Sequence, residues 1–119
     1  MTSRRDILHI TKRIIWEEAC ATGVYQTPSL KSEGFIHCST VEQVLGPANE
    51  LYRGQQDLVL LIVNPQKLAA KVVYEDCYDT GQAFPHIYGP LNVDAVEKVV
   101  DFPPSADGGF ALPPELAEV

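Results

Sequence analysis

The sequence predicts an α+β fold, with a compact, mostly antiparallel and split β-sheet and two early helices. Short apolar runs typical of strands recur along the chain, whereas both helical patterns end by residue 54. The later strand-like runs have no long helical segments between them, so a regular βαβ alternation is not indicated. With 119 residues, 45% of them hydrophobic, the chain can bury one core, and we expect residues 1–119 to form a single domain.

The first half of the chain predicts two strands, each followed by a helix. Residues 6–10 form a short apolar run, and Thr11 can cap a helix whose apolar residues recur between 14 and 20 and which ends at Gly23. A loop is expected around 27–29 and a second strand at 34–38. The next helix starts at Ser39 or Thr40, with a capping box to Gln43, is kinked or restarted at Pro47, and ends at Gly54.

The second half predicts a buried strand and several exposed ones. Residues 58–63 are apolar at every position, which indicates a central strand covered on both faces. Residues 76–83 are polar and small, so they predict an exposed loop. The other elements expected are strands at 71–75, 84–90 and 96–102, one helical turn at 93–95, and an acidic, proline-rich tail at 103–119.

The composition excludes several classes of partner. The net charge is −7, and after Arg13 only five basic residues stand against fifteen acidic ones, so no surface for duplex nucleic acid is expected. No apolar run approaches the roughly 18 residues that span a membrane, and no signal peptide is indicated. Three cysteines without a Cys-x-x-Cys spacing favour reduced thiols. We therefore expect a cytoplasmic protein.

The histidines are the first candidates for chemistry. Each of the three stands in a short strand-like run, and each is followed two residues later by a hydroxyl side chain on the same face of the strand. The pairs are His9 with Thr11, His37 with Ser39, and His86 with Tyr88. The imidazole and hydroxyl groups of such pairs could bind a ribose or a phosphate through hydrogen bonds. The alternatives are a partly buried histidine satisfied by the backbone, and a hydroxyl that only caps the next helix.

Other chemistries receive less support from the residue pattern. The histidines lie 28 and 49 residues apart, which is no metal-ligand spacing, so no metal is expected. Cys38 follows His37 directly and must face the other side of the strand, which favours a buried apolar residue over a nucleophile. Arg53 could hold a ligand phosphate or could stabilise the end of its helix. Neither a G-x-G-x-x-G nor a Walker-type motif is present.

Four segments together resemble the DUF952 family of small, mainly bacterial proteins without an established activity. They are residues 9–11, 29–40, 57–61 and 84–91, and the resemblance extends over about residues 6–112. The resemblance implies a fold similar to that of the ADP-ribosyltransferase-like group, which includes RNA 2′-phosphotransferases. In that group the NAD site opens with His-Gly-Thr, which His9-Ile10-Thr11 resembles.

Two further elements of that group can be compared with this chain. Residues 34–39, followed by Ala48-Asn49 and Tyr52, look like its second element. Its third element is a glutamate on a late strand, where this chain has His86-Ile87-Tyr88 and no matching glutamate. A carboxylate there stabilises the positive charge that develops on the ribose, so ordinary ADP-ribosyl transfer is not expected.

The resulting hypothesis is a transferase-like enzyme acting on a nucleotide-type ligand such as NAD, ADP-ribose or a phosphorylated species. His9, His37 and His86 should converge within roughly 10–12 Å on one cleft, together with Ser39 and Tyr88. The predicted catalytic residues are His37 and His86, and the predicted ligand-binding residues are His9 and Thr11 for ribose, Ser39 and Arg53 for phosphate, and Tyr88. The alternative is a non-catalytic sensor or protein-interaction module on a degenerate transferase fold, for which the acidic tail favours a protein partner.

Overall fold

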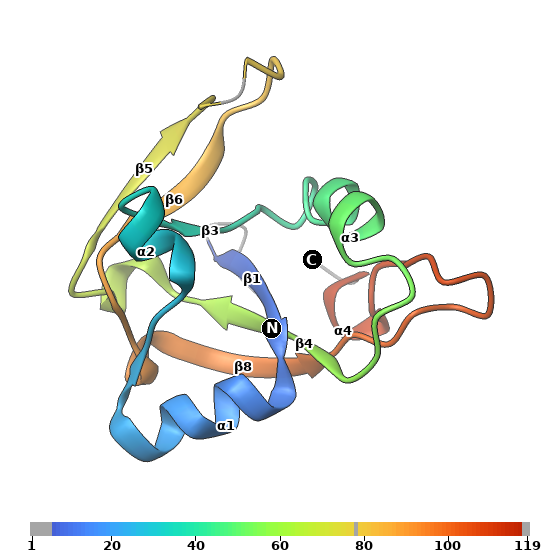
Figure 1. Cartoon of the computed structure of the whole chain (residues 1–119), viewed down its shortest axis with the longest axis horizontal. Coiled ribbons are helices and arrows are strands. Elements are labelled where there is room, and N and C mark those ends of the chain that lie inside the picture. Colours follow the sequence, from blue (N-terminus) through green and yellow to red (C-terminus); the bar gives the residue numbers. More distant parts are fainter. Residues whose placement is uncertain (1–5, 78, 118–119) are drawn as a thin grey trace.

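Three small antiparallel sheets form the framework of the molecule (Figure 1). The computed structural model describes residues 6–77 and 79–117. Its main sheet has the order β1-β4-β8, in which β1 spans Ile7–Lys12, β4 spans Leu58–Val63 and β8 spans Val96–Asp101. All pairings found are antiparallel, so the predicted α+β class with a split antiparallel sheet is confirmed.

Strand β4 is central and buried on both faces, as its uninterrupted apolar sequence predicts. Because successive side chains of a strand point to opposite faces, β4 divides its residues between two cores. Val59 and Leu61 pack in a cluster with Ile36 and Ile87. Leu60 packs in a second cluster with residues of the helical segment 44–48 and of the C-terminal region.

The two smaller sheets lie beside the main one. Strands β2 (Val24–Tyr25) and β7 (Leu91–Asn92) form one pair. The other sheet has the order β3-β6-β5, in which β3 spans Ile36–His37, β5 spans Lys71–Glu75 and β6 spans Phe84–Tyr88. In Figure 1 the β5–β6 hairpin extends from the upper left of the molecule.

Helices are few and short. The α-helices are α1 (Arg13–Thr22), α2 (Pro28–Ser32), α3 (Leu45–Leu51) and α4 (Pro114–Ala117), and the 3₁₀ turns are η1 (Pro65–Lys67) and η2 (Val93–Ala95). None of the helices within the described ranges has the length and apolar character needed to cross a membrane.

A short junction connects β1 to the segment that follows β3. The backbone N–H of Leu8 donates to the carbonyl of Ser39 at 2.7 Å, and the N–H of Ser39 donates to the carbonyl of Leu8 at 2.8 Å. This isolated bridge holds the main sheet against the β3-β6-β5 sheet. The histidines of β1 and β3 are thereby placed close together.

Both early helices begin later than the sequence predicts. Thr11 does not cap α1, because β1 continues through Thr11 to Lys12, where it pairs with β4, and the helix starts at Arg13. The predicted contact of Gln43 with the backbone N–H of Thr40 forms at 3.1 Å, but α3 starts only at Leu45. Pro47 lies in its first turn, where a missing N–H costs no helical hydrogen bond, so the helix needs no restart.

Several elements escape prediction because they are short. Helix α2 lies where a loop is expected, and β2, β7 and α4 have no clear periodic signal. The C-terminal segment folds back onto the domain: Phe110 and Leu116 are buried in the second core, and the N–H of Phe110 donates to Asn49 Oδ1 at 2.7 Å. Much of the predicted tail is therefore part of the packed structure.

Replacing Leu60 with alanine should lower the free energy of unfolding by about 2–5 kcal/mol, because this fully buried side chain fills the second core. Val99→Ala on β8 is the matched control; its side chain is 38% exposed, so a loss below about 1 kcal/mol is expected. Urea denaturation of both variants provides the measurement. Equal losses would contradict the central position of β4.

Candidate functional site

A cavity of about 900 Å³ lies where β1, β3 and β6 meet the α3 segment. Its volume is in the range of roughly 300–1,000 Å³ that is typical of small-molecule sites. Residues from β1, from the start of α2, from 37–39, from 43–55 and from 80–86 line it. The cavity is thus built from segments that are far apart in the sequence.

The three histidines converge on this cavity, as the sequence predicts, and all three line it. His37 and His86 face each other across the β3–β6 pair, with ring centroids 5.3 Å apart. The ring of His9 contacts the backbone carbonyl of His37. Thr11 and Ser39 also line the cavity, so five of the seven predicted site residues come together there.

His9 is a neutral, fully hydrogen-bonded histidine. Its Nδ1 lies 2.6 Å from the carbonyl oxygen of His37, which can only accept, so Nδ1 carries the proton. Nε2 then accepts from the hydroxyl of Tyr25 at 2.7 Å. Burial lowers the pKa of His9 to about 4, and burial also raises the pKa of Tyr25 to about 12. His9 therefore acts as a fixed hydrogen-bonding group in the cavity wall near neutral pH.

His86 is paired with a carboxylate from the neighbouring strand. Its Nδ1 lies 2.8 Å from Glu75 Oε2, and the hydroxyl of Tyr88 donates to the same oxygen. The pKa of Glu75 is lowered by both hydrogen bonds, and the hydrogen bond from Tyr88 has the larger effect. The ring of Phe35 stacks on His86 with centroids 4.0 Å apart. A proton on Nδ1 leaves Nε2 as an acceptor, and no hydrogen bond of Nε2 occurs within the described ranges.

His37 is more open than the other two histidines. Its side chain is 42% exposed, and its Nε2 lies 3.0 Å from Glu33 Oε1. The adjacent Cys38 is buried, and burial raises the pKa of its thiol. The prediction that Cys38 is a buried apolar residue is therefore confirmed, and His37 is the most exposed of the three histidines at the cavity.

Two predicted ligand-binding residues lie outside the lining of the cavity. Arg53 follows α3 and points to the C-terminal segment, where its guanidinium lies 3.8 Å from the carboxylate of Asp107 and donates to the carbonyl of Asp107 at 3.3 Å. The hydroxyl of Tyr88 is engaged by Glu75. Asp107 of the folded C-terminal segment contacts this arginine, and the phosphate contact of Arg53 stays a prediction.

Sequence reasoning missed Tyr25 and Glu75, the partners of the two buried histidines. Tyr25 belongs to a two-residue strand, and Glu75 ends an alternating strand that looks exposed. The one available signal is that residues 71–75 and 84–88 could form a hairpin, which places Glu75 opposite Phe84 and near His86. Only pairing and register identify these contacts.

Comparisons with known proteins place the chain among relatives that carry no assigned activity. A family model described as "Protein of unknown function (DUF952)" matches residues 10–99. The chain is similar to the crystal structure of protein CC0527 from Caulobacter crescentus, with a TM-score of 0.84 and 35% identity over 94% of this chain and 98% of that one. The solution NMR structure of CC0527 gives a TM-score of 0.75 and 34% identity over 97% and 99%. No curated protein matches.

The buried His9 should make stability dependent on pH. Because its pKa is about 4 in the folded chain and 6.5 when exposed, only the unfolded chain binds this proton between those values. The free energy of unfolding should fall by on the order of 3 kcal/mol as the pH drops from 6.5 towards 4. Above pH 6.5 the stabilisation that comes from the neutral, buried His9 should be fully present.

Denaturation curves of the wild type and His9→Gln across this pH range measure the effect. Carboxylates titrate in both proteins, so the difference between the two curves isolates His9. Parallel curves would contradict the assignment of a neutral, buried His9.

Proposed function

The chain belongs to the DUF952 family, and because that family has no assigned chemistry, we propose from the site that it is a transferase-like enzyme acting on a nucleotide-type ligand. The cavity takes the ligand, and His86 accepts a proton from a hydroxyl group of the ligand or of the acceptor. The single observation that carries the proposal is the Glu75–His86 pair in the wall of a ligand-sized cavity.

The lining of the cavity suits a nucleoside. Aromatic side chains of Tyr25, Tyr52 and Phe84 provide apolar surface for a base. The hydroxyl groups of Thr11 and Ser39 offer partners for ribose hydroxyls, whereas both ring nitrogens of His9 are already hydrogen-bonded to His37 and Tyr25. The cavity wall thus has an aromatic part and a hydroxyl-bearing part. This arrangement suits a ligand in which a planar apolar group is joined to a hydroxyl-rich group.

The charge of the lining limits the number of phosphates. Among the lining residues that the structure describes, Lys12 is the one lysine or arginine, and Glu50 lies in the same wall. His9 is neutral near pH 7. A nucleoside or a ligand with one phosphate near Lys12 is therefore favoured over one with a pyrophosphate, because each additional negative charge needs a partner.

The roles of the catalytic groups follow from their hydrogen bonds. Glu75 accepts the Nδ1–H of His86, which fixes the ring and leaves Nε2 able to take a proton. Glu75 itself does not line the cavity, so it acts through His86 as a positioning residue. His37, whose ring centroid lies 5.3 Å from that of His86, can pass the proton to solvent.

The finer part of the proposal is that the fold is ADP-ribosyltransferase-like. It is supported by the split antiparallel sheets and by His9 and Thr11, which share one face of β1 at the cavity. The arrangement departs from that group at the late strand, where His86 lines the cavity and the carboxylate of Glu75 stands behind it. A ribosyl cation that develops in the cavity would therefore contact the imidazole of His86 and not the carboxylate of Glu75.

The ligand class is tested by melting the protein with a panel of nucleosides, nucleoside monophosphates, ADP-ribose and NAD in the presence of a chelator. A ligand at 100 times its dissociation constant should add about 2.7 kcal/mol of stability. Nucleosides or monophosphates should give the largest shifts. A panel without any shift would contradict the nucleotide class.

Catalysis is tested by chromatography of the best-binding ligand after incubation with the protein and a hydroxyl acceptor. Replacing Glu75 with glutamine should keep ligand binding but lower turnover about 10²–10⁴-fold, because His86 loses the partner that orients it. Glu97→Gln is the matched control, a carboxylate of β8 that pairs with Lys67 outside the cavity, and should leave turnover unchanged. Binding without turnover in the wild type would show a sensor instead of an enzyme.

Release of nicotinamide from NAD should stay at the rate of a sample without protein. The reason is that Glu75, the carboxylate bound to His86, is not among the described residues that line the cavity, so it does not face the cation formed when the glycosidic bond breaks. Rapid release that disappears in His86→Gln would overturn this reading of the site.

A further inference from the structure

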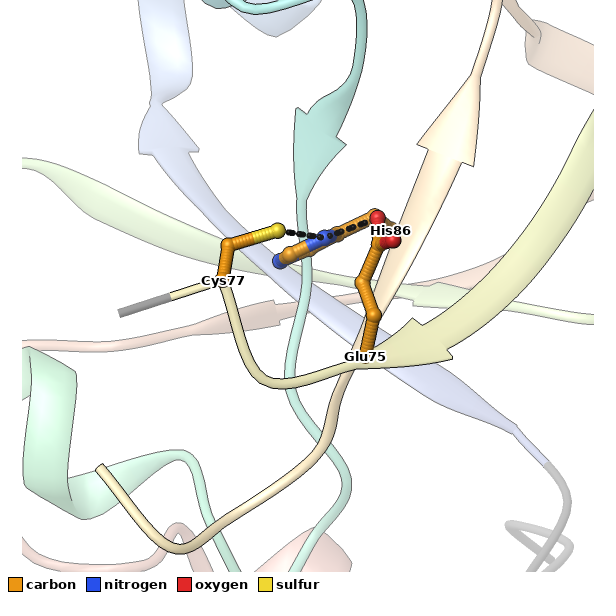
Figure 2. Close-up of side chains that lie close together, drawn as sticks. All are labelled: Glu75, Cys77 and His86. Carbon is orange, nitrogen blue, oxygen red and sulfur yellow. Dashed lines mark hydrogen bonds and ion pairs between the residues drawn. The ribbon is translucent and has the colours of Figure 1, made fainter. Parts of the chain in front are cut away.

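Three potential metal ligands converge on one point near the loop end of the β5–β6 hairpin, where β5 ends at Glu75. Figure 2 shows the side chains of Glu75, Cys77 and His86 directed towards one another. His86 Nδ1 lies 2.8 Å from Glu75 Oε2 and 3.9 Å from Cys77 Sγ, and all the ligand atoms lie within 4.8 Å of one another. We propose that these three residues bind a zinc-class divalent ion.

Two of the separations between ligand atoms lie within about 0.5 Å of those around such an ion. Zinc bound at about 2.3 Å from sulfur and about 2.0 Å from nitrogen and oxygen separates these ligands by roughly 3.3–3.5 Å. The observed separations of 2.8 and 3.9 Å lie on either side of that range. Cys77 is exposed, so a small rotation of its side chain brings the sulfur into place.

A Cys–His–Glu nucleophilic triad does not explain the arrangement. In such a triad the thiol and the carboxylate occupy different nitrogens of the imidazole, so that the ring can move a proton between them. Here both groups lie against the same nitrogen, Nδ1 of His86. Convergence of three donors on one point is the geometry of metal coordination.

The charges also favour a cation. The carboxylate of Glu75 lies within 4.8 Å of the thiol of Cys77. On binding a divalent ion the thiol would release its proton to solvent, and the charges of thiolate and carboxylate would balance the two charges of the ion.

The donor set selects the metal. One sulfur, one nitrogen and one oxygen suit zinc or cobalt, whereas magnesium and calcium prefer oxygen alone. Three protein ligands leave one position of a tetrahedral site for water. The ion would lie behind His86, because Glu75 and Cys77 are not among the residues that line the cavity.

Metal binding would change what His86 presents to the cavity. Coordination uses the lone pair of Nδ1, so the proton of the neutral ring moves to Nε2, which becomes a donor. In the proposed reaction, Nε2 must accept a proton, and the predicted effect of the ion on turnover rests on that proposed function. The ion would therefore inhibit turnover, whereas metal binding itself does not depend on the proposed function.

The test is a titration of the reduced, metal-free protein with Co²⁺, which gives a thiolate-to-cobalt charge-transfer absorption when sulfur is a ligand. The wild type should show the band with one ion per chain, and Zn²⁺ should abolish it by displacement. Cys77→Ser should lose the band. Cys20→Ser is the matched control, since Cys20 is also exposed but lies on α1, and it should keep the band.

A second variant separates the carboxylate from the thiol. Glu75→Gln should keep the band but weaken the affinity for Co²⁺ by about tenfold or more. No band in the wild type, or an unchanged band in Cys77→Ser, would overturn the proposed site. The titration contains no nucleotide, and the turnover assay contains a chelator, so failure of one proposal is distinguishable from failure of the other.

Discussion

The junction between β1 and residues 37–39 is the interaction on which the site depends. Two backbone hydrogen bonds between Leu8 and Ser39 join the sheets, and the side chain of His9 adds a third bond to the carbonyl of His37. The third bond is partly buried and satisfies the carbonyl of His37 with the buried side chain of His9, where an unpaired polar group would be costly. His9 is therefore first of all the connector of two sheets, and its presence in the cavity wall is a consequence.

One atom of the second buried histidine, Nδ1 of His86, determines whether this side chain offers the cavity a hydrogen-bond acceptor or a donor. Nδ1 of His86 contacts the carboxylate of Glu75 and lies near the thiol of Cys77, while the ring itself is clamped by Phe35. When Nδ1 carries the proton, Nε2 presents a hydrogen-bond acceptor to the cavity. When Nδ1 binds a metal ion, Nε2 carries the proton and presents a donor. The same geometry thus supports proton transfer and its control by a metal.

The electrostatics of the cavity differ from what the net charge suggests. The chain has a charge of −7, yet much of the lining is neutral, and within residues 6–77 and 79–117 its charged side chains apart from the histidines are Lys12 and Glu50. Arg53 is held by Asp107 of the packed C-terminal segment. The wall offers aromatic surface and hydroxyl groups, which favour a nucleoside-like ligand over a highly charged one.

The sequence by itself determined the α+β class, the central strand and the histidine–hydroxyl pairs on β1 and β3, because these follow from local patterns of apolar and polar residues. It could not identify Tyr25 and Glu75 as histidine partners, since those contacts depend on the pairing of β2 and on the register of β5 against β6. It also could not show that Phe110 and its neighbours fold back onto α3 and bring Asp107 to Arg53, because that segment leaves no periodic signal. Contacts between distant segments were decided only by the tertiary structure, where strand register and side-chain packing select one partner among many.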